Sequence, residues 1–348
     1  MTRSKGTRRS IRALRWLVVA IAGVVLWRAL AAADLPRALG LVVAIGPAVA
    51  VILVPFVVAM SLDVLGWREV YAGLGRSVPF LPFLGTRIAG EAVLQSLPGG
   101  QVVAESMAPY LLQSRCGVPL AEGFAGLALK KLLFTIAHGT LILGGALLGW
   151  ASLVRISPGL VGGSWLPAVI AAIGATVIVS GAVGIFALLR GDPARRVSEL
   201  LHLLPIAVVR RFAESRHEAF VATDRHVASA WAGARVPRAL ALFLAFWLVE
   251  AGETWLVLKL LGAPLPVREV LSFEAAISLV RALAFFVPAG LGVQDVAYMA
   301  MLRALGVADA VTVGAAFVML KRAKEGIWIV VGYVLLLGMR GVPAPAET

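Results

Sequence analysis

Long apolar segments constrain the fold of this chain more than any other feature of its sequence. A helix needs about 20 residues to cross the roughly 30 Å hydrocarbon core of a bilayer. Six segments reach that length or come close to it, at residues 16–33, 39–62, 124–150, 165–189, 237–261 and 310–339. Of the 348 residues, 60% are hydrophobic and 15% are charged, whereas soluble domains carry roughly 25% charged residues. The sequence therefore predicts an all-α, polytopic membrane protein with six transmembrane helices.

Two further apolar regions are each broken by proline and glycine. The first joins segments 81–97 and 101–115 across Pro98-Gly99-Gly100, and the second joins segments 269–287 and 293–305 across residues 288–292. Proline ends a helix, and glycine permits a sharp reversal of the chain. Because a second arm of fifteen residues reaches only about 22 Å as a helix, we expect two re-entrant helical hairpins that enter the membrane without crossing it. The alternative is that each region forms two full spans joined by an ordinary turn.

The positions of the basic residues predict the orientation of the chain in the bacterial inner membrane. Residues 1–15 hold six Lys and Arg side chains and should be cytoplasmic, because these residues are concentrated in cytoplasmic loops. Counting spans from there places the basic segment 190–236 and the tail 340–348 in the cytoplasm, and the Gly/Ser-rich loop 151–164 outside. Segment 16–33 is long for the apolar core of a signal peptide and lacks a good cleavage site, so we expect it to remain as the first span.

Net charge and side-chain chemistry exclude several classes of function. The net charge of +13 gathers at the predicted cytoplasmic ends of the spans, where it would contact anionic lipid headgroups, so no nucleic-acid partner is expected. The single cysteine, Cys116, rules out an intramolecular disulfide and a multi-cysteine metal site. The four histidines form no pair with metal-binding spacing. Neither a metal nor a cofactor is predicted.

The two broken regions share a pattern of charged residues with respect to their prolines. Glu91 and Arg281 each lie seven residues before the proline of the break, and Lys131 and Lys321 each lie 33 residues after it. Each broken region is also preceded by two predicted spans and followed by a third. The sequence therefore divides into two units of the same plan.

These two units are predicted to be inverted with respect to each other. The first, residues 16–150, would begin in the cytoplasm, and the second, residues 165–339, would begin outside. Many secondary transporters are built from such inverted repeats, with broken helices around a binding site near the bilayer midplane. The alternative is a chance similarity between apolar segments.

Four charged residues interrupt the middle of the last apolar segment. Lys321 and Glu325 are four residues apart, which lets them pair on one helix face, whereas Arg322 and Lys324 have no further partner within the segment. A charged side chain at the bilayer centre costs at least about 2.5–3.5 kcal/mol, so we expect these groups to face the protein interior. A surplus of cations there would hold a polar or anionic lipid headgroup. The alternative is a structural ion network between helices.

Charged residues in and around the hairpins form the predicted substrate-binding set, and the breaks form the predicted gating set. The substrate-binding set is Arg281, Lys321, Arg322, Lys324, Glu325, Glu91, Glu105, Asp295 and Lys131. The gating set is Pro98, Gly99, Gly100, Pro288, Gly290 and Gly292. No catalytic residue is predicted, and membrane lipids are the expected partners.

The breaks also carry a resemblance to a known family. The motifs at residues 97–100, 287–295 and 306–322 resemble those of the flippase-like membrane family typified by the transmembrane region of bacterial lysylphosphatidylglycerol synthase. The resemblance covers roughly residues 16–339. It implies a membrane protein that takes part in lipid translocation or lipid-associated transport.

Two details refine what the resemblance implies. Residues 281–295 most resemble the hopanoid-biosynthesis-associated branch of the family, with Asp295 standing where Glu is expected. Because only nine residues follow residue 339, we expect no aminoacyl-transferase domain, and the resemblance is not taken to imply lysyl transfer. The sequence thus predicts a flippase-like transporter of a lipid, and not an enzyme.

Two alternative functions stay open. A membrane-embedded lipid-modifying enzyme would need an acid/base pair, and Glu250 and Glu253, three residues apart, come closest to one. A non-transporting scaffold would gather lipid or hopanoid biosynthesis enzymes on segment 190–238 and would lack an internal cavity. A polar cavity between the hairpins would favour transport over the scaffold.

Overall fold

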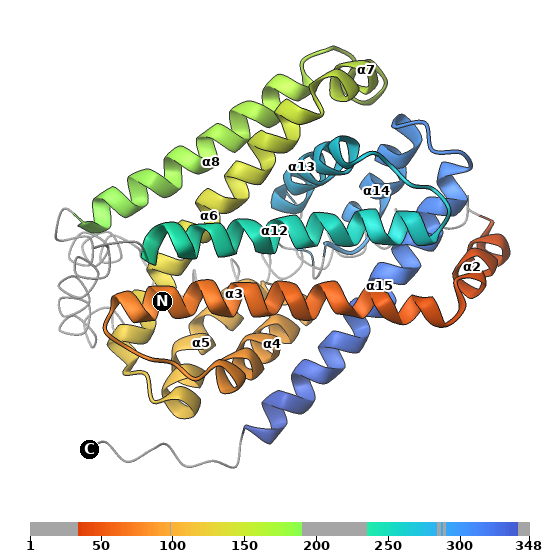
Figure 1. Ribbon diagram of the computed structural model, residues 1–348. Coiled ribbons are helices and arrows are strands. Elements are labelled where there is room, and N and C mark those ends of the chain that lie inside the picture. The colour runs from red at the N-terminus through yellow and green to blue at the C-terminus, as the bar shows by residue number, and fades with distance from the viewer. Residues whose placement is uncertain (1–33, 98, 190–234, 284–286, 288–289, 340–348) are drawn as a thin grey trace, which may run out of the picture.

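The computed structural model describes residues 34–97, 99–189, 235–283, 287 and 290–339 (Figure 1). Within these ranges the regular structure is helical, and no β-strand occurs. The predicted first span, the tail 340–348, nearly all of segment 190–236, Pro98 and Pro288 lie outside the described residues.

The helices follow one another closely along the described chain. They are α2 (Leu35–Ala44), η1 (Gly46–Leu53), α3 (Val54–Gly73), α4 (Phe80–Ser96), α5 (Gly100–Cys116), α6 (Leu120–Leu148), α7 (Trp150–Val161), α8 (Leu166–Leu189), α12 (Arg235–Leu260), α13 (Val267–Leu283), α14 (Val293–Ala304) and α15 (Ala310–Gly338). Four of the described helical segments are long and apolar enough to cross a membrane, namely Gly46–Gly73, Leu120–Leu148, Leu166–Leu188 and Arg235–Leu260. The chain is thus a multi-pass, all-α membrane protein, as its sequence predicts.

The last helix, α15, is long but not uniformly apolar. It contains 29 residues, which extend about 43 Å and exceed the thickness of a bilayer core. Its limits agree with the predicted segment 310–339 to within one residue. Because four charged residues lie at its middle, α15 is not one of the four apolar spans. The side chains of these residues face the protein interior described below.

The predicted span 39–62 is wrong in its limits. The chain turns at Gly46, whose φ is 60°, and Pro47 cannot donate a backbone hydrogen bond, so α2 ends before this point. The crossing segment runs over Gly46–Gly73 instead. Hydropathy alone places the end of the apolar run at Asp63, but the side chain of Asp63 is fully buried inside the protein.

The prediction of a loop over 151–164 is also wrong, because most of this segment forms the helix α7. The buried residues of α7 are Ser152, Leu153, Ile156 and Ser157. Their spacing puts them on one helix face, which packs against the rest of the protein. The helix then ends at Gly162 in the left-handed conformation, with a φ of 73°. The Gly and Ser content of the segment concealed this amphipathic pattern.

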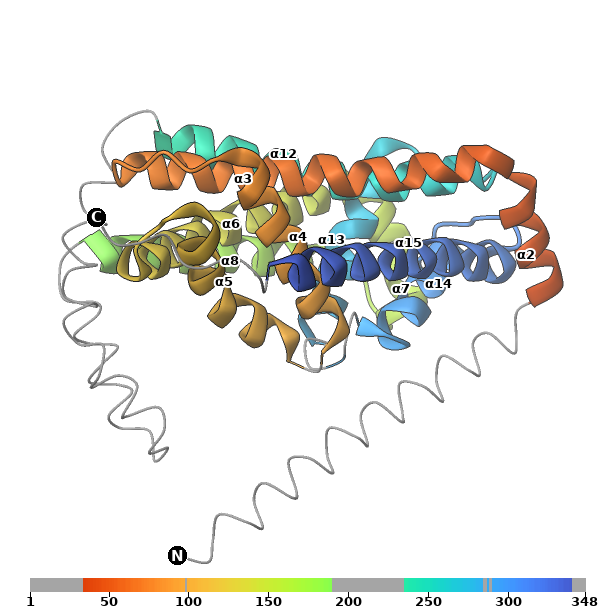
Figure 2. The ribbon, with the colours of Figure 1, turned by 90° about the horizontal axis from the view of Figure 1, so that it is seen from below.

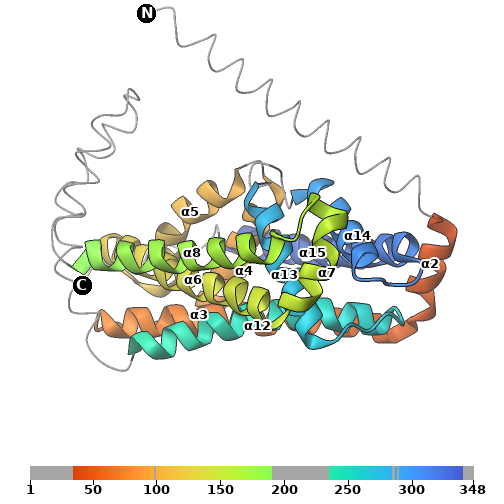
Figure 3. The same ribbon diagram turned by 90° about the horizontal axis from the view of Figure 1, so that it is seen from above.

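The long helices lie in layers. Helices α3 and α12 run side by side in one layer, and α6, α8 and α15 form the next (Figures 1 and 2). The second arms of the two broken regions, α5 and α14, lie on the side away from α3 and α12 (Figure 3). The two broken regions therefore pass through the middle layer and bring their breaks toward the same side of the protein.

The two broken regions pack on each other's long helices. The first arm α4 packs against α15, and the first arm α13 packs against α6. Glycines make both contacts close, because a Cβ at Gly332 of α15 would lie 2.7 Å from the carbonyl oxygen of Ile88 on α4, and one at Gly145 of α6 would collide with the carbonyl oxygen of Leu271 on α13. We call this arrangement the reciprocal packing. It holds each hairpin against a helix from the other half of the chain.

The outer faces of the peripheral helices are apolar. On α8, Val179, Val183 and Phe186 are exposed, and on α15, Val330 and Val334 are exposed. Exposed apolar side chains in such number indicate membrane contact in a protein of this composition. Apolar side chains thus lie on the outside and charged side chains in the interior, which is the opposite of their distribution in a soluble protein.

Candidate functional site

A cavity of about 380 Å³ lies between the two hairpins and the long helices α3, α6, α12 and α15. Charged side chains from both halves of the chain line it: Arg87, Glu91, Glu105, Lys130, Lys131, Glu250, Arg281, Lys321, Lys324 and Glu325. Gly100 and Gly290, one from each break, also line it. The cavity thus gathers deep charges and non-helical backbone in one place.

Most of the predicted substrate-binding residues line this cavity. They are Arg281, Lys321, Lys324, Glu325, Glu91, Glu105 and Lys131. They come from both arms of the first hairpin, the first arm of the second, and helices α6 and α15. The remaining two, Asp295 and Arg322, are not among the lining residues and lie beside the second break.

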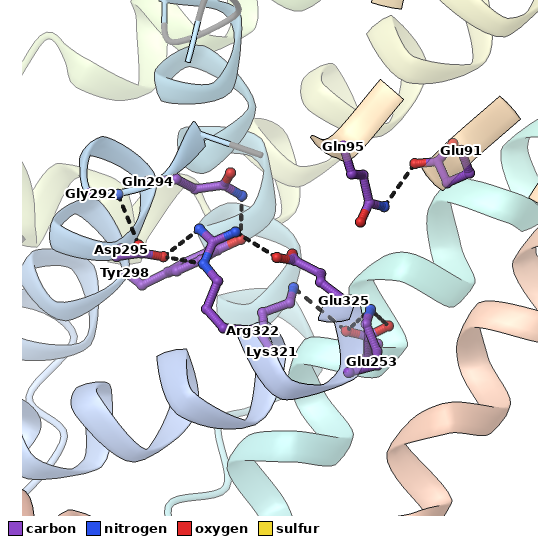
Figure 4. A network of polar contacts seen from close by, with 11 residues as sticks. Glu91, Gln95, Glu253, Gly292, Gln294, Asp295, Tyr298, Lys321, Arg322 and Glu325 are labelled. Atoms are coloured by element: carbon purple, nitrogen blue, oxygen red, sulfur yellow. Dashed lines mark hydrogen bonds and ion pairs between the residues drawn. The ribbon is translucent and has the colours of Figure 1, made fainter. Parts of the chain in front are cut away.

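Asp295 and Arg322 hold the second break in place (Figure 4). The Arg322 Nε donates to Asp295 Oδ1 over 3.0 Å, and the backbone N–H of Gly292 donates to the other carboxylate oxygen over 2.9 Å. Asp295 caps the first turn of α14 in this way, which stabilises the helix start. Arg322 also pairs with Glu325 at 2.5 Å. The expected pairing of Glu325 with Lys321 is therefore wrong, because Glu325 turns toward Arg322.

The first half of the chain contributes an ion network centred on Asp63. This carboxylate is fully buried on α3 and accepts from Arg87 of α4 and from Lys130 of α6, the latter with an N–O distance of 3.0 Å. Arg87 also pairs with Glu91, one turn along α4, at 2.7 Å. The three helices α3, α4 and α6 are thereby tied together at the cavity wall.

The second half contributes a corresponding network centred on Glu253. This carboxylate is buried on α12, and both of its oxygens lie 2.6 Å from the Lys324 ammonium of α15. Lys321 lies 3.8 Å from the same carboxylate. Arg281 of α13 pairs with Glu274 at the longer distance of 3.7 Å. The contacts of Glu253 with Lys324 and Lys321 therefore join α12 to α15.

The expected surplus of cations is wrong for the described residues. Around the cavity the cations are Arg87, Lys130, Lys131, Arg281, Lys321, Arg322 and Lys324, and the carboxylates are Asp63, Glu91, Glu105, Glu250, Glu253, Glu274, Asp295 and Glu325. The sequence of α15 alone could not reveal this, because its cations find their partners on α12 and α14. Tertiary packing supplies the missing carboxylates.

The two second arms make the same kind of ion pair with the long helix that follows. Glu105 of α5 pairs with Lys131 of α6, and Asp295 of α14 pairs with Arg322 of α15. Each carboxylate lies seven residues after the proline of its break, and the cations lie 33 and 34 residues after it. The Glu105–Lys131 and Asp295–Arg322 ion pairs therefore occupy corresponding positions in the two units.

Several residues of the cavity wall were not predicted. Trp67, Trp247 and Gln95 line the cavity, and each has a buried polar side-chain atom with no hydrogen-bond partner. Buried polar groups in proteins are nearly always satisfied, so these two indole N–H groups and this amide oxygen are unusual features of the cavity wall. Asp63 was missed as well, and a lone carboxylate in an apolar run is the signal that could have found it.

Metal-binding geometry does not occur in the described part of the chain. No three or more His, Cys, Asp and Glu side chains there are grouped to hold an ion. His138 instead stacks on Trp247 at 3.9 Å and shares a hydrogen bond of 3.0 Å with Ser278 of α13. This histidine therefore joins α6, α12 and α13.

Comparison with known proteins gives one match. A family model described as the lysylphosphatidylglycerol synthase TM region matches residues 15–320. The match ends just before Lys321, so the four charged residues of α15 follow directly after it. Neither the curated proteins nor the solved structures provide a match.

Proposed function

The chain belongs to the lysylphosphatidylglycerol synthase transmembrane-region family, and on this premise we propose that it is a flippase-like transporter that moves a lipid across the bacterial inner membrane. Membership makes it a membrane protein tied to lipid synthesis or translocation. The observation that supports transport is the charged cavity enclosed between the two broken hairpins. A scaffold would have no use for such a cavity.

The size and lining of the cavity suit the headgroup of a lipid rather than the whole molecule. About 380 Å³ lies at the lower end of the roughly 300–1,000 Å³ of small-molecule sites. The acyl chains would stay among the exposed apolar side chains outside. The headgroup would meet charged groups of both signs together with the aromatic side chains of Trp67 and Trp247.

Lys131 and Arg281 are the cations that we propose contact the headgroup. Their side chains are 35% and 33% exposed, whereas those of Arg87, Lys130, Lys321, Arg322 and Lys324 are below 20%. Lys131 comes from the first half of the chain and Arg281 from the second. A phosphate between them would exchange places with Glu105 and Glu274, the carboxylates that they now contact.

We also propose that the two halves are inverted repeats with re-entrant hairpins, six spans in all, and both termini in the cytoplasm. The reciprocal packing supports this, because α4 on α15 and α13 on α6 are equivalent contacts. The second arms α5 and α14 have 17 and 12 residues, which extend only about 25 and 18 Å. Irregular backbone at membrane depth is tolerated beside a polar cavity, where Gly100 and Gly290 lie.

We place transport ahead of lipid modification. The nearest acid/base pair is Glu250 and Glu253, and the ammonium of Lys324 lies within 2.6 Å of both oxygens of Glu253. A carboxylate bonded in this way is held as an ion-pair partner, which suits a structural or switching role better than proton abstraction from a substrate. The proposed protein is therefore a carrier and not an enzyme.

The proposal is tested with the full-length protein in liposomes that contain a trace of fluorescently labelled phosphatidylglycerol, phosphatidylethanolamine or a hopanoid lipid. Dithionite quenches label in the outer leaflet, so the loss of protected label reports flipping. We expect Lys131→Ala and Arg281→Ala each to slow flipping at least about tenfold, because a charged hydrogen bond contributes roughly 1.5–3 kcal/mol and about 1.4 kcal/mol is a factor of ten.

Arg155→Ala is the matched control. Arg155 is an arginine in an ion pair with Glu269, but it lies on α7, outside the cavity, and its loss should leave flipping unchanged. Normal flipping in both Lys131→Ala and Arg281→Ala would refute the proposed headgroup contacts. No flipping of any of these lipids by the parent protein would refute the transport function.

A further inference from the structure

Around the cavity, the first half of the chain supplies equal numbers of cations and carboxylates. The second half supplies one more carboxylate than cations. In the first half, the cations Arg87, Lys130 and Lys131 face the carboxylates Asp63, Glu91 and Glu105, three against three. In the second half, the cations Arg281, Lys321, Arg322 and Lys324 face the carboxylates Glu250, Glu253, Glu274, Asp295 and Glu325, four against five. With every group ionised, the second cluster carries a net charge of −1.

Glu250 is the carboxylate without a bonded partner. Glu253 is paired with Lys324, Glu274 with Arg281, and Asp295 and Glu325 with Arg322. Glu250 lines the cavity, and among the described residues no hydrogen bond or ion pair reaches its carboxylate.

The charged groups that face Glu250 come from three helices. Glu253 lies one turn along α12, Lys321 and Lys324 lie on α15, and Arg281 lies on α13. The two lysines are shared with Glu253, which holds Lys324 at 2.6 Å and Lys321 at 3.8 Å. Glu250 thus stands beside cations that another carboxylate already holds.

The titratable groups near the cavity on α3 and α6, which also pack against α12, are bonded elsewhere. Asp63 of α3 and Lys130 of α6 pair with each other. His138 of α6 shares its hydrogen bond with Ser278 of α13. They therefore add no counter-charge to that of Lys321, Lys324 and Arg281, none of which is bonded to Glu250.

We propose that Glu250 is a proton-binding site that couples lipid movement to a proton gradient, an inference that rests on the proposed transport function. A carboxylate that is largely removed from bulk water, and that no cation bonds to directly, favours its neutral form. A proton from the aqueous phase to which the cavity opens forms an O–H bond with the Glu250 carboxylate, and the same bond breaks when the proton leaves to the opposite phase. No other bond changes, and charge is conserved across one cycle.

Protonation of Glu250 also sets the contacts between α12 and α15. With Glu250 neutral, the second cluster has four cations and four carboxylates, and both lysines stay with Glu253. With Glu250 ionised, it competes with Glu253, one turn away, for Lys321 and Lys324. The proton therefore selects between two positions of α15 against α12, and the reciprocal packing carries that difference to α4 of the first hairpin.

The direct test is infrared spectroscopy of the full-length protein in lipid vesicles, titrated from acidic to alkaline pH. A protonated carboxyl group has a carbonyl stretch that a carboxylate lacks. We expect such a band at acidic pH, its loss at alkaline pH, and its absence from Glu250→Gln. In Glu250→Asp the band should return at a shifted frequency. Glu269→Gln, which removes a carboxylate paired with Arg155 outside the cavity, should keep the band unchanged.

The second measurement is flipping of labelled phosphatidylglycerol in vesicles with and without a gradient of about one pH unit, a tenfold difference in proton activity. The parent protein and Glu269→Gln should flip faster with the gradient, whereas Glu250→Gln should flip at one rate in both conditions. An identical band in the parent and in Glu250→Gln, or equal parent rates with and without the gradient, would overturn the proposal. If the parent flips no lipid in either condition, the transport function fails, while the infrared band still decides whether Glu250 binds a proton.

Discussion

Removal of the Asp63 carboxylate should strongly destabilise the protein. Asp63 is fully buried and bonds to Arg87 and Lys130. In Asp63→Asn, Arg87 keeps its contact with Glu91 at 2.7 Å, but Lys130 keeps no carboxylate among the described residues. Removal of one partner from a buried ion pair typically costs about 3–5 kcal/mol, because the other charge stays buried without compensation.

The surroundings of Lys130 place the loss at the lower end of that range. Its ammonium lies 4.2 Å from the centre of the Phe134 ring and 5.3 Å from that of Trp67. A desolvated cation over an aromatic face retains about 2 kcal/mol of attraction. The expected decrease in the free energy of unfolding is therefore about 3 kcal/mol.

The assay is reversible unfolding in mixed detergent micelles of increasing SDS fraction, followed by circular dichroism. Arg76→Ala serves as the control, because Arg76 forms a comparable ion pair with Glu122 but is 48% exposed, and such pairs contribute at most about 1 kcal/mol. The double variant Asp63→Asn with Lys130→Met should recover most of the loss, because it removes both charges. The reasoning is refuted if Asp63→Asn costs no more than Arg76→Ala, or if the double variant is less stable than Asp63→Asn.

Two further predictions concern helix contacts, and a third concerns the depth of the first hairpin in the membrane. Gly332→Ala should lower the unfolding temperature, because its Cβ would meet Ala92 at 2.5 Å, whereas Gly326→Ala on the same helix meets nothing within 4 Å and should raise it slightly. Ser96→Ala removes a hydrogen bond of 2.6 Å to α15 and should cost about 0.5–1.5 kcal/mol in the same detergent titration. With Cys116 replaced by Ser, Gln101→Cys at the tip of the first hairpin should resist a membrane-impermeant maleimide added from outside, and rapid labelling there would show that the hairpin crosses fully.

Helix positions could be predicted well because apolar length and the breaks determine them. The limits of α6, α8, α12 and α15 agree with the predicted segments to within four residues. The errors arose where a few polar or small residues made the hydropathy pattern misleading. Asp63 seemed to end a span whose helix continues for another three turns, and the Ser and Gly residues of α7 seemed to form a loop.

The composition of the cavity wall could be predicted in part, and its pairing could not. Deep charged residues near the breaks identified most of the charged lining, because charge at that depth has to face the interior. The partners were hidden because they lie far apart in the chain, with Asp63 and Lys130 separated by 67 residues and Glu253 and Lys324 by 71. Local spacing suggested Lys321 with Glu325, but Glu325 pairs with Arg322 of the same helix and Lys321 lies beside Glu253 of α12.

The reciprocal packing also sets the order in which the protein can be completed during synthesis. The surface around Gly332 on which α4 rests belongs to α15, near the end of the chain. The first hairpin therefore leaves the ribosome long before its partner exists, with Ile88 and Ala92 uncovered and Arg87 close by. Until α15 arrives, this hairpin needs lipid or an insertion factor as a temporary neighbour. A truncated first half would remain in that unfinished state, so expression of the two halves from separate genes should yield stable protein only when both are made together.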